Sequence, residues 1–242
     1  ADRFGHDDYR GVDVKGRIVA VLQGRPLRFP TEEGAHFSSR QEKRVLAAQR
    51  GAVGLVTLHT PLAEKATPFA KALERAAFPQ MDWLSPDGQP GHALAGMRDD
   101  VVLSQAGAAR LFAGAALSLD AIYALAAADK PLPQLDLKVQ LHTARSSVRT
   151  RIQSSNVVGM IEGSDPRLKH EYVVFSAHLD HLGQVKEKSG DNIYNGAMDN
   201  ASGVATLLET ARLFSQAGAR PKRSILFVAL TAEEKGLLGS DY

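Results

Sequence analysis

The sequence predicts an α/β protein with two domains, because strand-length apolar runs alternate with amphipathic helical stretches along most of its length. Pro131 and Pro133 stand in a short segment that cannot continue a helix, so we place the domain boundary there. We expect a smaller mixed α+β domain over residues 1–130 and, over residues 131–242, the amino-terminal part of a three-layer αβα domain.

Composition narrows the class of protein. The chain has 242 residues, of which 44% are hydrophobic and 23% charged, as in soluble globular proteins. The formal net charge is only +2 and no dense basic run is present, so we expect no nucleic-acid partner. No apolar run approaches the ~20 residues of a membrane span, so we expect no membrane contact either. Without cysteine, any metal must be held by His and carboxylate side chains.

The amino-terminal domain is predicted to begin with a strand, helix, strand unit. A turn glycine, Gly16, precedes the first apolar strand, and Gly51 ends the helix before the second. We expect residues 60–90 to be irregular, because Pro, Gly and mixed polar residues dominate them. The expected elements are strands at 16–22, 52–58 and 101–104, and helices at 39–50, 106–113 and 119–128.

The carboxyl-terminal domain is predicted from four strands and one long helix. Residues 135–141 alternate strictly between apolar and polar, as a half-exposed edge strand does. The runs at 172–176 and 224–230 are continuously apolar, which is typical of strands buried on both faces. A strand at 156–161 and an amphipathic helix at 201–216 complete the expected set. The stripe of the helix that we expect to be buried consists of Val204, Leu207, Leu208, Ala211 and Phe214.

Polar side chains come directly after two of these strands and before the helix, where functional groups of open α/β sheets collect. His178 could offer a ring nitrogen to a divalent metal, and Asp180 could bond the other nitrogen and fix the tautomer. Asp199 could be a simple helix cap, but the small residues around it leave room for a carboxylate that bridges two ions.

Glu233 and Glu234 come after the most hydrophobic strand of the chain. Their charges repel one another and burial disfavours both, so a cation is the natural compensation, although a solvated charged turn is the alternative. Adjacent side chains diverge, so one can bind a metal while the other acts as a general base. Together with imidazole and without thiolate, these oxygen donors suit zinc, manganese or cobalt in a hydrolytic site.

These motifs resemble the zinc-dependent exopeptidases of metallopeptidase family twenty-eight, which includes leucyl-type aminopeptidases and glutamate carboxypeptidase. The matching motifs are SAHLDHLG at 176–183, NGAMDNASGVA at 195–205 and RSILFVALTAEEKGLLGS at 223–240. The resemblance implies a zinc-exopeptidase fold and two zinc ions. It makes His178, Asp199 and Glu234 metal ligands, with Asp199 bridging.

The resemblance also implies that Glu233 is the base that activates water, that Asp180 orients His178, and that the peptide bond after Asp199 is cis. The amino-terminal domain resembles, less specifically, a protease-associated domain, through residues 14–21 and 47–54. His170 and His181 are other candidate ligands, but we expect His181 to lie outside the ligand set and His170 on the opposite side of the sheet.

The family completes its metal sites with an Asp and a His downstream of the Glu pair, and neither occurs here before Tyr242. We therefore expect the chain to be part of a longer protein, with weak zinc binding or none and no activity by itself. The expected function is hydrolysis of the amino-terminal peptide bond of a peptide substrate. The alternatives are a carboxypeptidase of the family and an inactive receptor relative. By analogy, we expect an exported protein, periplasmic or secreted; the sequence does not predict its oligomeric state.

Overall fold

A computed structural model describes residues 4–184 and 190–242. Two compact units make up the chain, and the chain passes between them more than once. The first unit contains residues 1–79 and 94–147, and the second contains residues 80–93 and 148–242. The division therefore does not follow a single cut at residue 130. The identification of the first unit as a protease-associated domain stays a prediction.

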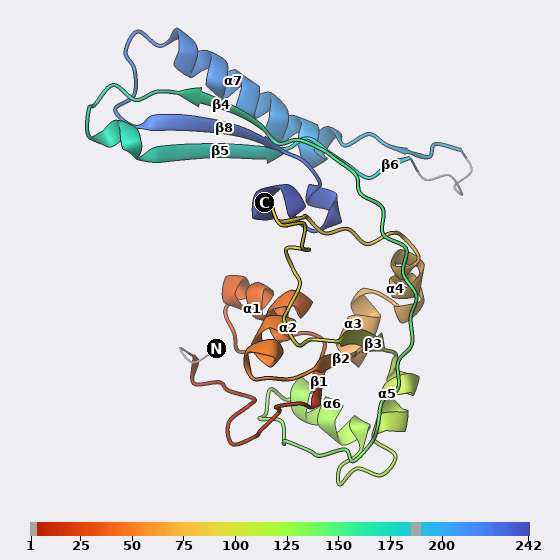
Figure 1. Cartoon of the computed structure of the whole chain (residues 1–242). Helices are drawn as coiled ribbons and strands as arrows, with labels where there is room; N and C mark the ends of the chain where they lie inside the picture. The colour runs from red at the N-terminus through yellow and green to blue at the C-terminus, as the bar shows by residue number, and fades with distance from the viewer. Residues whose placement is uncertain (1–3, 185–189) are drawn as a thin grey trace. The chain divides into compact units, whose positions relative to one another are not determined.

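The first unit is built on a three-stranded parallel sheet in the order β1-β2-β3 (Figure 1). The strands are β1 (Ile18–Leu22), β2 (Gly54–Leu58) and β3 (Asp99–Leu103), and Ile18 pairs with Gly54, which pairs with Asp99. Every residue of β2 is buried, because the middle strand is covered on both faces. The predicted strand, helix, strand unit is confirmed as β1, α2 (Arg40–Gln49) and β2.

Side-chain caps explain where several helices of this unit begin. Ser39, Thr60, Ser104 and Ser118 each accept a hydrogen bond from the backbone N–H three residues later. The helices of the unit are α1 (Thr31–Ser38), α2, α3 (Pro61–Ala66), α4 (Phe69–Ala76), α5 (Gln105–Leu111) and α6 (Leu119–Ala127). Helices α3 and α4 lie where we expected irregular chain, so that prediction was wrong. Thr60-Pro61, a cap followed by proline at the first helical position, was the signal for α3.

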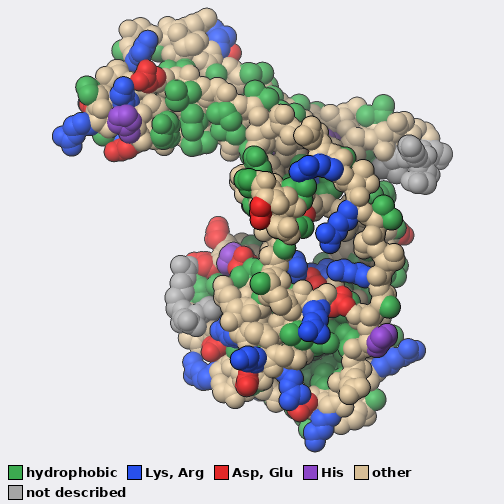
Figure 2. Space-filling view, in the orientation of Figure 1, with side chains coloured by type: hydrophobic (Ala, Val, Ile, Leu, Met, Phe, Trp, Pro, Cys, Tyr) green, Lys and Arg blue, Asp and Glu red, His purple; other side chains and the backbone are tan. Residues whose placement is uncertain are grey.

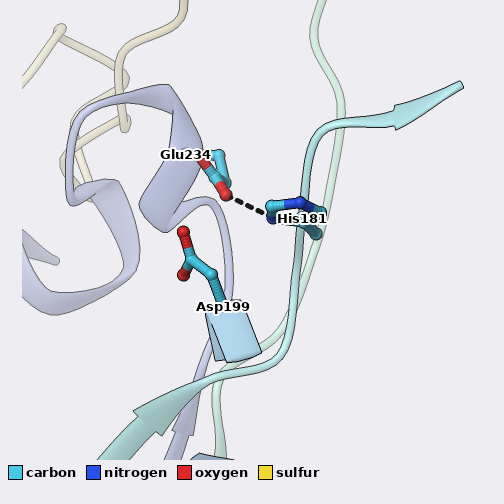
Figure 3. Close-up of side chains that lie close together, drawn as sticks. All are labelled: His181, Asp199 and Glu234. Atoms are coloured by element: carbon cyan, nitrogen blue, oxygen red, sulfur yellow. Dashed lines mark hydrogen bonds and ion pairs between the residues drawn. The ribbon is translucent and has the colours of Figure 1, made fainter. Parts of the chain in front are cut away.

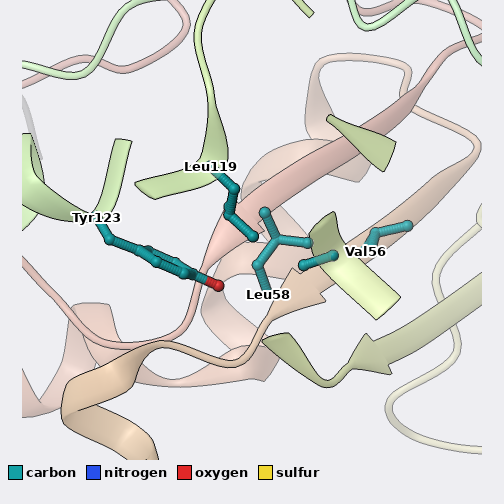
Figure 4. Packing of buried hydrophobic residues seen from close by; sticks show 5 residues of the cluster. Val56, Leu58, Leu119 and Tyr123 are labelled. Carbon is teal, nitrogen blue, oxygen red and sulfur yellow. The ribbon is translucent and has the colours of Figure 1, made fainter. Parts of the chain in front are cut away.

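The core of the first unit lies on both faces of β2. Val56 and Leu58 pack with Leu119 and Tyr123 on the α5 and α6 side (Figure 4). Leu55 points the other way and packs with Ala47 of α2. The alternation of the strand thus fixes which helices cover which face.

The second unit is built on a mixed sheet in which β8 is the central strand (Figure 1). Strand β8 (Ser224–Leu230) pairs antiparallel with β4 (Val157–Ile161) and parallel with β5 (Tyr172–His178). Helix α7 (Ser202–Gln216) lies on one face and packs through Leu207 against Ala177, Ile225 and Phe227. The other elements are β6 (Gly183–Gln184), β7 (Ile193–Tyr194), α8 (Leu238–Asp241) and the short turns η2 (Leu168–His170), η3 (Ala197–Ala201) and η4 (Glu233–Lys235).

Three expectations for this unit were wrong. Residues 135–141 form no strand: they find no pairing partner, and side chains such as Leu141 fix the segment to the first unit instead. Leu208, expected on the buried stripe of α7, is 65% exposed. The third expectation, that the sheet is buried on both faces, also fails. A continuous apolar run shows that a covering layer would be favourable, but it does not show that the layer is present.

On the face away from α7, Val158, Met160 and Val174 are more than half exposed. Figure 2 shows the hydrophobic side chains gathered there. Within the described residues, no helix has both the length and the apolar character that crossing a membrane requires.

Helix α7 offers a matched test of the core of the second unit. Leu207 is 7% exposed and Leu213 is 57% exposed on the same helix. Leu207→Ala should lower the free energy of unfolding by about 2–5 kcal/mol, because it leaves a cavity against β5 and β8. Leu213→Ala should change it by less than about 1 kcal/mol. Urea denaturation followed by circular dichroism measures both; equal effects would contradict the described packing.

Candidate metal centre

The site is built where two parallel strands end together. His178 is the last residue of β5 and pairs with Leu230, the last residue of β8. The segments after them, 179–181 and 231–236, therefore start at the same edge of the sheet. The turn before α7 supplies Asp199 at this edge. The three motifs that the sequence predicted to meet are thus close together.

His178 lies between two predicted site residues. Its Nε2 is 2.9 Å from Oδ1 of Asp199 and 3.8 Å from Oε2 of Glu233. The His178 side chain is 11% exposed, whereas that of Asp199 is 66% exposed. Nε2 is therefore the ring nitrogen that faces the carboxylates.

Burial lowers the pKa of His178, but its neighbours outweigh burial and raise the pKa above the ordinary value. The opposing causes are the backbone carbonyl of Asp180, the charge of Glu233 and the hydrogen bond and charge of Asp199. Protonated His178 is therefore favoured by the same carboxylates that would share a cation with it.

His181 forms the second imidazole and carboxylate pair of the site. Its Nδ1 is 2.6 Å from Oε1 of Glu234, and Figure 3 shows this pair with Asp199 beside it. One ligand atom of each of His181, Asp199 and Glu234 lies within 4.8 Å of the others. Asp199 thus approaches both imidazoles, the one of His178 and the one of His181. The structure brings His181 into the site, although we expected it outside the ligand set.

Asp180 makes different contacts from those expected. The nearer acceptor for Nδ1 of His178 is the backbone carbonyl of Asp180, at 3.0 Å, while its carboxylate lies at 3.8 Å. The carboxylate accepts hydrogen bonds from the backbone N–H groups of Glu233, at 3.1 Å, and Glu234, at 3.3 Å. Asp180 therefore fixes the His178 ring through its backbone and the Glu pair through its side chain.

Asn156 closes the loop that carries the Glu pair, a role that we did not expect for it from the sequence. Its Nδ2 donates to the carbonyl of Gly239 at 2.7 Å, and its Oδ1 accepts from the N–H of Thr231 at 3.1 Å. A side chain at Gly239 would collide with the carbonyl of Thr231, so only glycine fits there. The only signal in the sequence was a polar residue directly before an apolar strand.

The turn before α7 places Asp199 with little room to spare. Oδ1 of Asn200 accepts a hydrogen bond from the N–H of Gly203 at 3.0 Å, and a Cβ at Gly203 would collide with that side chain. Glycine at position 203 is thus needed for the close approach of the Asn200 side chain. The peptide bond between Asp199 and Asn200 is cis, as the family resemblance implied.

A cavity of about 340 Å³ adjoins the site. It lies between the 179–181 segment and the start of α7, and Leu179, Val204 and Leu208 give it apolar walls beside His181. None of the described residues that line it is a Lys or Arg. His170, by contrast, belongs to η2 at the amino end of β5, away from the site.

The residues present fit a divalent metal of the zinc type. Two imidazoles and the carboxylates of Asp199, Glu233 and Glu234 converge without thiolate, a donor set that catalytic zinc uses. In the described parts of the chain, no Lys or Arg forms an ion pair with these three carboxylates. A cation at their centre would supply the missing compensation. The individual ligand roles stay predictions.

A family model matches the part of the chain that builds the site. The model of peptidase family M28 matches residues 156–242. Aminopeptidase NAALADL1 of Mus musculus is 38% identical over 110 residues, which cover 43% of this chain and 12% of that protein. A probable zinc metalloprotease of Pyricularia oryzae is 38% identical over 98 residues, which cover 40% of this chain and 18% of that protein.

Transferrin receptor protein 2 of Homo sapiens resembles the chain over a longer stretch. It is 30% identical over 258 residues, covering 96% of this chain and 28% of the receptor. The chain thus spans less than a third of the length of each of these relatives. The family match covers the whole of the site: β5, the turn before α7, β8 and the Glu pair all lie within residues 156–242. The part of the chain that builds the site thus matches the model of peptidase family M28.

Proposed function

We propose that this protein is a metal-dependent exopeptidase, and more narrowly an aminopeptidase that uses two zinc ions. One observation carries the proposal: two imidazoles and three carboxylates from separate motifs converge at one edge of the sheet, within the part that matches a peptidase family. The zinc is also supported by the name of the Pyricularia oryzae relative, a probable zinc metalloprotease.

His178, Asp199 and Glu234 would hold the zinc, with His181 as a further ligand candidate beside Glu234. Bound zinc polarises a substrate carbonyl and makes water more acidic. The carbonyl of Asp180, 3.0 Å from Nδ1 of His178, holds the ring so that Nε2 stays directed at Asp199.

Glu233 is the base of the proposed reaction. Its side chain is 32% exposed and its backbone is held by the carboxylate of Asp180, so the carboxylate can reach a substrate while the main chain stays fixed. It takes a proton from the attacking water and gives it to the amine of the departing peptide.

The charges near the site favour an amino-terminal substrate. A carboxypeptidase needs a cation for the terminal carboxylate of its substrate. No such cation lines the described cavity. Peptides blocked at either end separate the two activities: an acetylated amino terminus should abolish cleavage and an amidated carboxyl terminus should not.

A receptor-like function without catalysis is the second candidate. It is favoured by the match to transferrin receptor protein 2, which covers 96% of the chain, whereas the match to NAALADL1 covers 43%. It would require no metal and no base. Zinc binding together with peptide hydrolysis would exclude it, and neither would be seen if it held.

Glu233→Gln in the parent-length protein tests the assigned base. The substitution keeps the shape of the side chain but removes the proton acceptor, so peptidase activity should fall by about 10²-fold or more. Zinc content should stay unchanged. Hydrolysis of an aminoacyl anilide measures the activity, and Glu209→Gln on the exposed side of α7 is the matched control. Activity retained by Glu233→Gln would refute the assignment.

The raised pKa of His178 predicts a pH dependence of zinc binding. Zinc needs the neutral ring, and in zinc-stripped protein the raised pKa keeps the ring protonated to higher pH. Affinity should therefore fall as pH drops through that pKa, by about tenfold per pH unit for each proton released. Calorimetry in buffers of different ionisation enthalpy counts the protons, and binding without proton release would contradict the prediction.

His181 and His170 form a matched pair for testing the ligand set. His181→Ala removes the imidazole 2.6 Å from Glu234, so zinc affinity should weaken by about tenfold or more. His170→Ala, at the other end of β5, should leave it unchanged. Competition with a chromophoric zinc chelator measures both constants. Equal zinc affinities of the two variants would show that His181 is not a zinc ligand.

A further inference from the structure

Residues 80–93 interrupt the first unit in sequence but belong to the second unit in space. The segment is closed on itself by backbone hydrogen bonds. The N–H of Ser85 donates to the carbonyl of Gln89 at 2.9 Å, and the N–H of Gly91 donates to the carbonyl of Trp83 at 2.9 Å. A β-bridge joins Leu84 and Pro90. We call residues 80–93 the clasp.

Two side chains of the clasp contact the last residues of the chain. Nε2 of His92 is 3.1 Å from Oδ2 of Asp241, across 149 residues of sequence. The ring of Trp83 meets the ring of Tyr242 edge-on, with centroids 6.0 Å apart. A side chain at Gly91 would collide with the Trp83 indole, so the clasp is shaped to hold that ring.

His92 is aimed at Asp241 by a second carboxylate. Asp82 accepts from the backbone N–H of His92 at 3.2 Å and lies 2.8 Å from its Nδ1. With Nδ1 occupied, Nε2 is left for Asp241. Both His92 and Asp82 are 28% exposed, and Asp241 is 44% exposed, so the contact is partly shielded from water.

Asp241 is connected to the Glu pair by a short run of backbone hydrogen bonds. The N–H of Asp241 donates to the carbonyl of Leu237 at 3.1 Å, and the N–H of Leu237 donates to the carbonyl of Glu233 at 2.8 Å. The contacts of Asp241 therefore bear on the position of α8 (Leu238–Asp241) and of the turn before it.

We propose that His92 is a positioning residue: by holding Asp241, the clasp fixes α8 and through it the turn that carries Glu233 and Glu234. Its effect on zinc binding and catalysis rests on the proposed function. Its effect on the order of the turn does not. In this arrangement, residues far upstream of the peptidase motifs help to set the geometry of the base and of one metal ligand.

Hydrogen exchange on the zinc-stripped chain tests the proposal directly. His92→Ala should speed exchange of the Leu237 and Leu238 amides about fivefold, the worth of one net hydrogen bond. Asp241→Asn should act in the same direction. The double variant His92→Ala, Asp241→Asn should exchange little faster than either single variant, because both substitutions remove the same contact. His142→Ala, at an exposed position of the first unit, is the control.

Zinc affinity separates a positioning role of His92 from a role in stability alone, because a residue that only stabilises the fold would not change it. His92→Ala should weaken zinc binding several-fold while the melting temperature changes by no more than in the control. His92→Gln should recover part of the affinity, because its amide can still donate to Asp241.

The proposal is overturned if the Leu237 and Leu238 amides and the zinc constant stay unchanged in His92→Ala while only the clasp itself exchanges faster. If His92→Ala does not fold, Asp241→Asn decides, because it leaves the contact between Asp82 and His92 intact. Absence of zinc binding in the unmodified parent-length protein would refute the metal site, and exchange would still decide on the clasp.

Discussion

The parallel pairing of β5 with β8 is the constraint on which the site depends. Because His178 pairs with Leu230, the two strands end at the same edge of the sheet, and the segments that carry His181 and Glu233 start side by side. A slip of one residue would turn every side chain of the strand to the other face of the sheet. The core under α7, where Phe175 stacks on Phe227 with centroids 5.6 Å apart, opposes such a slip. Packing on one face of the sheet thus fixes the chemistry at its edge.

The turn with Glu233 and Glu234 takes its shape from groups outside it. Ala232 and Leu237 have positive φ, of 54° and 62°, a conformation that costs about 1–2 kcal/mol for residues with a side chain. The carboxylate of Asp180 and the amide of Asn156 offset this cost by bonding the turn's backbone at both ends. The backbone of the two adjacent acidic residues is therefore held by contacts that do not use their own carboxylates.

The sequence predicted what local pattern determines and failed where distant partners decide. Strands β1, β2, β5 and β8 and helix α7 followed from apolar periodicity, and the three clusters at their ends followed from the sheet rule. The strand expected at 135–141 failed because alternation does not supply a pairing partner. His181 was not expected in the site because nothing in the sequence tells which side chain of the loop turns toward Glu234. Asn156 was missed because its partners are 75 and 83 residues away.

Both imidazoles of the site come from one short segment, so a single position of the Asp199 side chain brings it close to both. His178 and His181 are three residues apart, and each has its own carboxylate within 2.9 Å. The Asp199 side chain is 66% exposed, so surrounding side chains do not confine it. Its position comes from its backbone, which the hydrogen bond from Gly203 to Asn200 ties to the first turn of α7. The packing of α7 on β5 and β8 therefore sets the distance from Asp199 to the two histidines. The pairing of β5 with β8 sets how the histidines and the Glu pair are aligned along the strands.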